Sequence, residues 1–148
     1  MMTKQEFIKS TAKVFESFGC KRHKKVFSYE HEDFYLFFIL IKSNYSDCYY
    51  LHINCAIKGL HSVIAPKEEY YDLLSYPRIT LLNGIWQLMP EELEADKYEE
   101  VLRKTIEVIL ERVKKRGIRF VKDLEKVDDK ITYGGILTKE AEEYLAKL

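Results

Sequence analysis

The sequence has few cysteines and no long apolar run. Its three cysteines cannot all pair within one chain, and no CxxC spacing is present, so we expect a reducing compartment and no structural zinc site. The longest apolar run, residues 34–41, is too short to span a bilayer. Residues 1–6 lead into a charged amphipathic segment and not into the apolar stretch of a signal peptide. We therefore expect a cytoplasmic protein with no membrane partner.

The sequence also lacks net charge. Its 24 basic and 24 acidic side chains give a formal net charge of zero, whereas nucleic-acid binders usually carry a basic excess that releases counterions. Nucleic acid is therefore not an expected partner. One dense basic run, residues 21–25, is interpreted as a solvated connection between a helix and a strand, whose charges protect an edge strand from aggregation. The alternative interpretation is that it binds phosphate or an acidic partner.

Sequence motifs of catalysis are absent too. No HExxH, GxSxG, Walker or dinucleotide-binding glycine pattern occurs. Cys48, His52 and Cys55 are close in sequence, but on a strand positions 48 and 52 share one face and position 55 takes the other. The carboxylates of residues 91–100 are expected to complement the dipole of a helix start. We predict no catalytic site, no metal and no cofactor, and so a chain that is not an enzyme.

The chain is rich in apolar and aromatic side chains. Hydrophobic residues make up 47% of it and aromatics 14%, with 11 tyrosines and 8 phenylalanines. A chain of 148 residues without repeats, linkers or low-complexity tracts fits a single domain, 1–148, with a sizeable core. Tyrosine suits both the edge of a core and a binding surface, so the excess favours an interaction face without deciding between the two.

The first half of the chain predicts a helix followed by a meander. Thr3 and Glu6 form a capping box, and apolar residues then recur at the 3.6-residue period until Gly19. Strands are expected over residues 25–31, 34–42 and 49–58, where short polar turns imply antiparallel neighbours.

The remainder is less regular before it becomes helical. Residues 66–75 are predicted as a short helix, and residues 78–82 and 85–88 as a hairpin around an Asn-Gly turn. A long helix is expected from Asp96 to Gly117, then a short helix near Phe120 and a last helix capped by Thr138. The predicted fold class is α+β, with an N-terminal helix, an antiparallel meander sheet of about four to five strands, and C-terminal helices packed on one sheet face.

The order of these segments resembles a bacterial family of small uncharacterised domains. The segments that carry the resemblance are FESFGCKR at 15–22, the aromatic strand near Phe27, IKS at 41–43, LHINCAI at 51–57, and Arg78 and Trp86 around the hairpin. Members of that family show a helix ending in a leucine-rich GFKK step, a QKS strand, a VNLGI strand and an RI…WW segment. In this chain, Cys20 stands where an aromatic is usual, and a single tryptophan stands where a pair is common.

The resemblance covers roughly residues 5–90 and carries expectations about function. Members of such families look like immunity or accessory proteins encoded near bacterial toxins, which bind a toxin and block it. The resemblance therefore implies a non-enzymatic α+β domain whose partner is another protein, for instance a toxin.

Five residues are the candidate partner-binding set: Tyr50, His52, Asn54, Arg78 and Trp86. The first three alternate with the apolar residues of one predicted strand, and aromatic and arginine side chains supply much of the energy of protein interfaces. The alternative function is a small-molecule-binding protein or an enzyme with a sheet-lined pocket around His52. A concave pocket with His52 beside a carboxylate would indicate that alternative.

Overall fold

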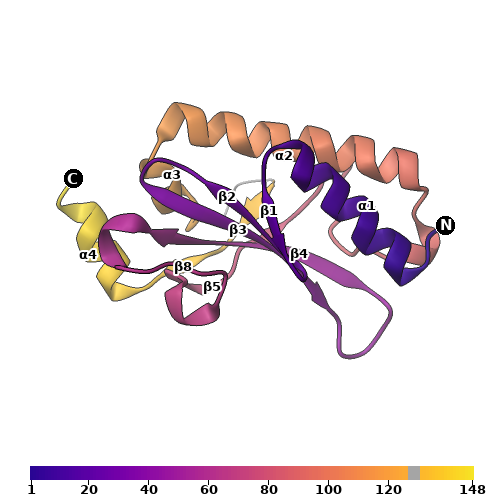
Figure 1. Cartoon of the computed structure of the whole chain (residues 1–148), viewed down its shortest axis with the longest axis horizontal. Coiled ribbons are helices and arrows are strands. Elements are labelled where there is room, and N and C mark those ends of the chain that lie inside the picture. Colours follow the sequence, from indigo (N-terminus) through magenta and orange to yellow (C-terminus); the bar gives the residue numbers. More distant parts are fainter. Residues whose placement is uncertain (127–130) are drawn as a thin grey trace.

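The fold is a six-stranded antiparallel sheet with helices, shown in Figure 1 as a computed structural model that describes residues 1–126 and 131–148. The helices are α1 (Lys4–Ser17), α2 (Ala95–Arg116), α3 (Arg119–Asp123) and α4 (Lys139–Ala146), with 3-10 helices η1 (Lys58–Leu60), η2 (Glu68–Tyr70) and η3 (Pro90–Glu92). The strands of the sheet are β1 (Lys21–His23), β2 (Val26–Glu30), β3 (Phe34–Lys42), β4 (Tyr49–Ile57), β6 (Arg78–Ile79) and β7 (Thr132–Tyr133). A separate pair is formed by β5 (Leu73–Ser75) and β8 (Ile136–Leu137).

The sheet begins as a meander. Its strand order is β1-β2-β3-β4-β6-β7, so the first four strands are neighbours both in sequence and in space, and every pair is antiparallel. The predicted α+β class, N-terminal helix and antiparallel sheet are confirmed. The sheet has six strands where four to five were expected, because β1 lies in the basic run interpreted as a connection and β7 is only two residues long and gives no periodic signal.

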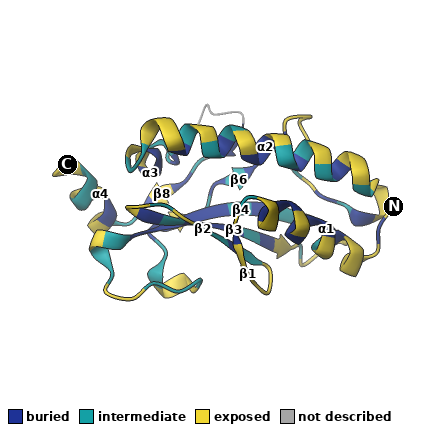
Figure 2. Ribbon diagram, turned by 45° about the horizontal axis from the view of Figure 1, so that its top comes forward, coloured by how far each residue is buried: buried dark blue, intermediate teal, exposed yellow. Residues whose placement is uncertain are grey.

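One face of the sheet, here called the inner face, carries the helices. Figure 2 shows α2 along one side of the sheet. Phe15 of α1 stacks on Phe27 of β2 at 4.7 Å and lies 4.8 Å from Phe38 of β3, between ring centroids. Phe7 of α1 contacts Tyr98 of α2 at 5.2 Å. The packing of α1 and α2 against the inner face builds the main apolar core.

Helix α1 begins as predicted. The Thr3 hydroxyl accepts a hydrogen bond from the Glu6 backbone N–H, and the Glu6 carboxylate accepts one from the Thr3 backbone N–H. A buried contact between the Thr11 and Tyr98 hydroxyls, 2.7 Å apart, joins this helix to α2. The joined helices pack together on the inner face of the sheet.

The basic run at residues 21–25 is more than a connection. Its first three residues form β1, which pairs with β2 in a tight hairpin, and Lys24 at the turn has φ 57°. The Arg22 Nε donates a hydrogen bond to the Lys24 carbonyl at 2.9 Å and braces that turn. The interpretation as a connection between a helix and a strand is therefore wrong for residues 21–23, while the exposure of these charges and their placement at a sheet edge are right.

The predicted helix at residues 66–75 is also wrong. The segment contains the 3-10 turn η2 and then β5, which pairs with β8 from the end of the chain. The predicted hairpin around Asn83 forms only at its tip, where the Leu81 N–H donates to the Ile85 carbonyl at 2.8 Å. Beyond the tip, β6 pairs with β4 and β7, and Leu88 bridges to Tyr49.

Among the described residues, no helix is both long and apolar enough to cross a membrane.

Candidate functional site

The candidate site lies on the outer face, defined here as the sheet face opposite α1 and α2. Residues directly opposite one another in antiparallel strands point to the same side. Cross-strand register aligns His23, Val26, Ile39, His52 and Arg78 in one row across the sheet. A neighbouring row pairs Ile41 with Tyr50, and another aligns Lys21, Ser28, Phe37 and Asn54.

A line of aromatic contacts runs across this face. Its partly solvent-exposed end, here called the open end, begins with Trp86, Tyr50 and His52. The Trp86 ring stacks on Tyr50 at 6.0 Å with an interplanar angle of 19°. Tyr50 meets His52 edge-on at 6.4 Å, and His52 meets Tyr76 in the same manner at 6.4 Å. All four side chains are half-buried, so each presents part of its surface to solvent while its neighbours hold it in place.

The line continues towards the covered end of the face. Tyr76 contacts Tyr71 at 5.8 Å, Tyr71 contacts Phe37 at 5.0 Å, and Phe37 stacks on Tyr35 at 6.1 Å. Phe37 is only 1% exposed, because Tyr71 lies against it. The outer face is thus partly buried and partly open to solvent, and it carries tyrosines in both parts.

Arg78 joins the open end through Trp86. Its guanidinium carbon lies 3.7 Å from the centre of the Trp86 ring, a close cation–π contact. Arg78 is also the cross-strand partner of His52 in β4. Four of the five candidate residues, Tyr50, His52, Arg78 and Trp86, are therefore brought together by the fold.

Two buried polar atoms of this cluster have no hydrogen-bond partner within the described residues: His52 Nδ1 and Arg78 Nε. Burial lowers the pKa of His52, and the positive charge of Arg78 lowers it further, while a hydrogen bond with the Tyr76 backbone acts in the opposite direction. His52 is therefore held in its neutral form beside the Arg78 cation.

This protonation state predicts acid sensitivity. Because the pKa of His52 in the folded protein lies below its ordinary value of 6.5, its stabilising contribution is present above that value and is lost as the pH falls through the lower, folded-state pKa. Between about pH 7 and about pH 5 the free energy of unfolding of the wild type should fall more than that of His52→Gln. Urea denaturation at several pH values measures this. His23→Gln, at an exposed position, is the matched control, and identical profiles for the wild type and His52→Gln would contradict the assignment.

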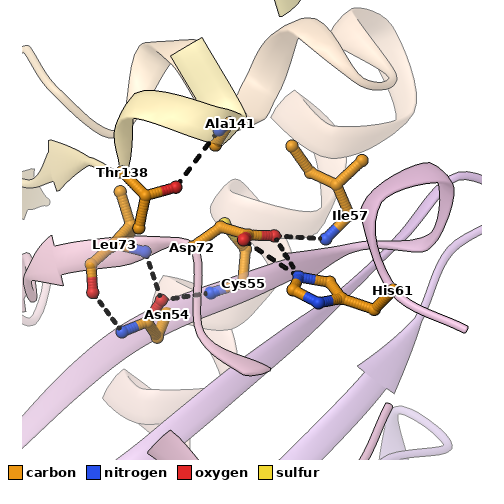
Figure 3. A network of polar contacts seen from close by, with 8 residues as sticks. All are labelled: Asn54, Cys55, Ile57, His61, Asp72, Leu73, Thr138 and Ala141. Carbon is orange, nitrogen blue, oxygen red and sulfur yellow. Dashed lines mark hydrogen bonds and ion pairs between the residues drawn. The ribbon is translucent and has the colours of Figure 1, made fainter. Parts of the chain in front are cut away.

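Asn54 does not belong to the open surface. It is 0% exposed, and its Nδ2 donates to the Leu73 carbonyl at 3.1 Å. Its Oδ1 accepts from the backbone N–H groups of Leu73 at 3.1 Å and Cys55 at 2.8 Å. Figure 3 shows this side chain clamped between β4 and the segment that follows η2. Its place in the candidate set is a correction, since strand alternation predicts which face a residue takes but not what covers that face.

Asp72 is the second anchor of the same segment. Its Oδ2 accepts from the Ile57 backbone N–H at 2.7 Å, and its Oδ1 lies 3.0 Å from His61 Nε2. Asp72 is 3% exposed, and burial raises the pKa of its carboxyl although the Ile57 N–H and His61 both act to lower it. Sequence reasoning missed this pair, because Asp72 fell within a predicted helix and no local spacing links it to His61.

The His61–Asp72 pair lies beside Cys55, which invites a comparison with nucleophilic sites. Burial is the main reason why the pKa of the Cys55 thiol lies well above its usual range, and the negative charge of Asp72 raises it further. A catalytic thiol needs the opposite shift, because the thiolate is the nucleophile. The network is best explained as a structural clamp that covers the edge of β4 with residues 72–77, where the Ile53 N–H donates to the Pro77 carbonyl at 2.9 Å.

Comparisons with known proteins give one match. A family model described as "Domain of unknown function (DUF4304)" matches residues 11–115. This range holds half of α1, nearly all of α2, the meander and every candidate residue. The searches of curated proteins and of solved structures returned no match.

Proposed function

We propose, from the premise that the chain belongs to the family Domain of unknown function (DUF4304), that it is a non-enzymatic domain which binds another protein. Recognition uses the open end of the outer face, formed by Tyr50, His52, Arg78 and Trp86. The observation that carries the proposal is the half-buried Trp86, held between Tyr50 and the Arg78 guanidinium. Tryptophan, tyrosine and arginine are the residues most enriched among interface hot spots.

The surroundings of this cluster suit an interface. Ile41, the cross-strand neighbour of Tyr50, is 37% exposed, and Ile85, next to Trp86 in the chain, is 38% exposed. These side chains extend the apolar area around the aromatic rings. Because Trp86 is already stacked in the free protein, little side-chain entropy remains to be lost when a partner binds.

The resemblance to small bacterial domains supports the finer part of the proposal. We place the protein in the bacterial cytoplasm as an immunity protein that binds and blocks a toxin. The alternative of a small-molecule pocket around His52 draws on the unpartnered Nδ1 of that residue. It is the weaker candidate, because that atom is covered and the buried carboxylate of this region is paired with His61 instead.

The test is a capture experiment with the full chain as bait. We expect the wild type to retain a partner from the native host, and Tyr50→Ala and Trp86→Ala to lose it, with affinity at least about 30-fold weaker if each is a hot spot worth about 2 kcal/mol. The matched control is Tyr45→Ala, because Tyr45 is 98% exposed in a turn outside the cluster.

Thermal unfolding of the same baits separates binding from folding. Each alanine variant should keep its melting temperature within a few degrees of the wild type, since the truncated side chains are half-buried and cost about 1 kcal/mol. Retention of the same partner by all four baits would contradict the proposal. So would a collapse of the melting temperature, which would show that Tyr50 and Trp86 are core residues.

A further inference from the structure

A groove lies on the outer face between the β1–β2 hairpin and residues 64–66. It encloses about 530 Å³, within the range of ~300–1,000 Å³ that is typical of ligand sites. Ser28, Tyr35 and Phe37 line it from the sheet, and Ile64 to Pro66 line it from the opposite side. The groove is therefore distinct from the Trp86 cluster, and its sheet side combines aromatic rings with polar and charged side chains.

The rim of the groove is positively charged. Lys21 and Arg22 line it directly, and Lys24 and Lys25 follow in the same hairpin. In the part of the chain that the structure describes, none of these four cations takes part in an ion pair. Since the protein as a whole has no net charge, this excess of positive charge is a local feature.

The acidic residue that lines the groove does not offset this excess. The Glu30 carboxylate lies 2.7 Å from Lys58 Nζ, and the same lysine lies 5.1 Å from the centre of the Tyr35 ring. The Glu30 charge is thus already matched by Lys58. Besides Lys58, Lys21 also helps to lower the pKa of Glu30, so a negatively charged occupant would share Lys21 with Glu30 and would meet Arg22 without a carboxylate partner among the described residues.

The backbone of β1 offers a further means of recognition. β1 is the first strand in the sheet order and has a neighbour on one side only, β2. An exposed sheet edge can accept an added strand from another chain, which gains affinity from backbone hydrogen bonds and specificity from alternate side chains. Lys21 and His23 of this edge share the outer face with the groove.

We propose that the groove takes an extended acidic peptide segment of a partner protein. The segment pairs with the free edge of β1 and sets its carboxylates against Lys21 and Arg22. From there it continues into the groove, where an apolar side chain lies on Tyr35. Nucleic acid or an anionic membrane would use the same cations, but neither would use the strand edge together with the aromatic lining. This inference rests on the proposed function and adds the chemistry of the partner.

Synthetic peptides test the groove directly. The probe is a short fluorescein-labelled peptide of alternating glutamate and leucine, measured by fluorescence anisotropy with the full chain. We expect saturable binding that weakens as salt is added. We expect binding at least about tenfold weaker for the counterparts with lysine in place of glutamate or serine in place of leucine. Equal binding of all three peptides would overturn the proposal, as would equally tight binding of oligothymidylate or of phosphatidylserine vesicles.

Two variants show whether the peptide probe binds in the groove. Lys21→Glu/Arg22→Glu reverses the rim charge, and Ala65→Trp fills the groove without changing any charge; each should weaken probe binding at least about tenfold. Lys9→Glu/Lys115→Glu applies the same charge change at exposed positions on the helices and should leave probe binding unchanged. Melting temperatures confirm that each variant is folded. Unchanged binding by both groove variants would overturn the proposal.

Capture of the native partner distinguishes a failure of the groove proposal from a failure of the proposed protein-binding function. Loss of capture by Trp86→Ala and by Lys21→Glu/Arg22→Glu would support both. Loss by Trp86→Ala alone would leave the proposed function standing and overturn the groove. Capture that survives both substitutions would overturn both proposals.

Discussion

Asn54→Leu is expected to lower the free energy of unfolding by about 3 to 5 kcal/mol, one of the two largest effects that we predict for a single substitution. Leucine has nearly the shape of asparagine but can neither donate nor accept a hydrogen bond. The change leaves three buried backbone groups unpaired: the Leu73 N–H, the Leu73 carbonyl and the Cys55 N–H. Each such group costs about 1 to 3 kcal/mol when it is left without a partner away from water.

Chemical denaturation of Asn54→Leu and of Asn83→Leu measures this effect against a matched control. Asn83 is exposed at the tip of a turn, and its Oδ1 accepts one hydrogen bond, from the Ile85 N–H at 3.2 Å. Water can replace that bond, so the control should lose about 1 kcal/mol or less. Equal losses at the two positions would show that the Asn54 clamp is not a major source of stability.

Phe15→Ala is expected to destabilise the fold by about 3 to 5 kcal/mol. The ring is 0% exposed and fills the space between α1 and the inner face, against Phe27 and Phe38. Its removal loses the transfer free energy of the ring and leaves a cavity that rigid neighbouring rings cannot close.

The control for this prediction is Phe18→Ala, at the residue that caps the end of the same helix. Phe18 is half-buried, so its truncation should cost about 1 to 2 kcal/mol. Guanidinium denaturation gives both values. A larger loss from Phe18→Ala than from Phe15→Ala would mean that the helix packs on the sheet in a different orientation.

The parts of the fold that could be predicted from the sequence are those with local, repeated signals. The capping box at Thr3 and the cap at Thr138 use side chains within three residues of the backbone that they bond. β4 alternates between buried and half-buried residues from Tyr49 to Ile53, and its inward residues Tyr49, Leu51 and Ile53 are buried as expected. Such elements carry their own pattern and do not depend on distant partners.

Residues 59–90 show why the rest could not be predicted. β6 is two residues long and exists because its backbone completes hydrogen bonds with β4 and β7. β5 pairs with β8, more than sixty residues further along the chain. No window of sequence contains both halves of these pairings, so the same residues were interpreted as a helix and a hairpin from proline and Asn-Gly signals alone.

The candidate site could likewise be predicted from the sequence only in part. Strand alternation placed Tyr50 and His52 on one face, while residue type and the family resemblance pointed to Arg78 and Trp86. Only the fold shows that Trp86 bridges Tyr50 and Arg78, and that the neighbouring Asn54 is sealed by Leu73.

By itself, the sequence determined which of the longer segments form helices and strands and how many aromatic and basic side chains the chain contains. Both follow from local properties, namely hydrophobic periodicity and residue type. The tertiary structure decided which of those side chains meet solvent. Coverage of a sheet face depends on segments that come from elsewhere in the chain, such as residues 72–77 over the edge of β4. That is why the sheet could be expected from the sequence, while the boundary between the buried and the exposed part of its outer face could not.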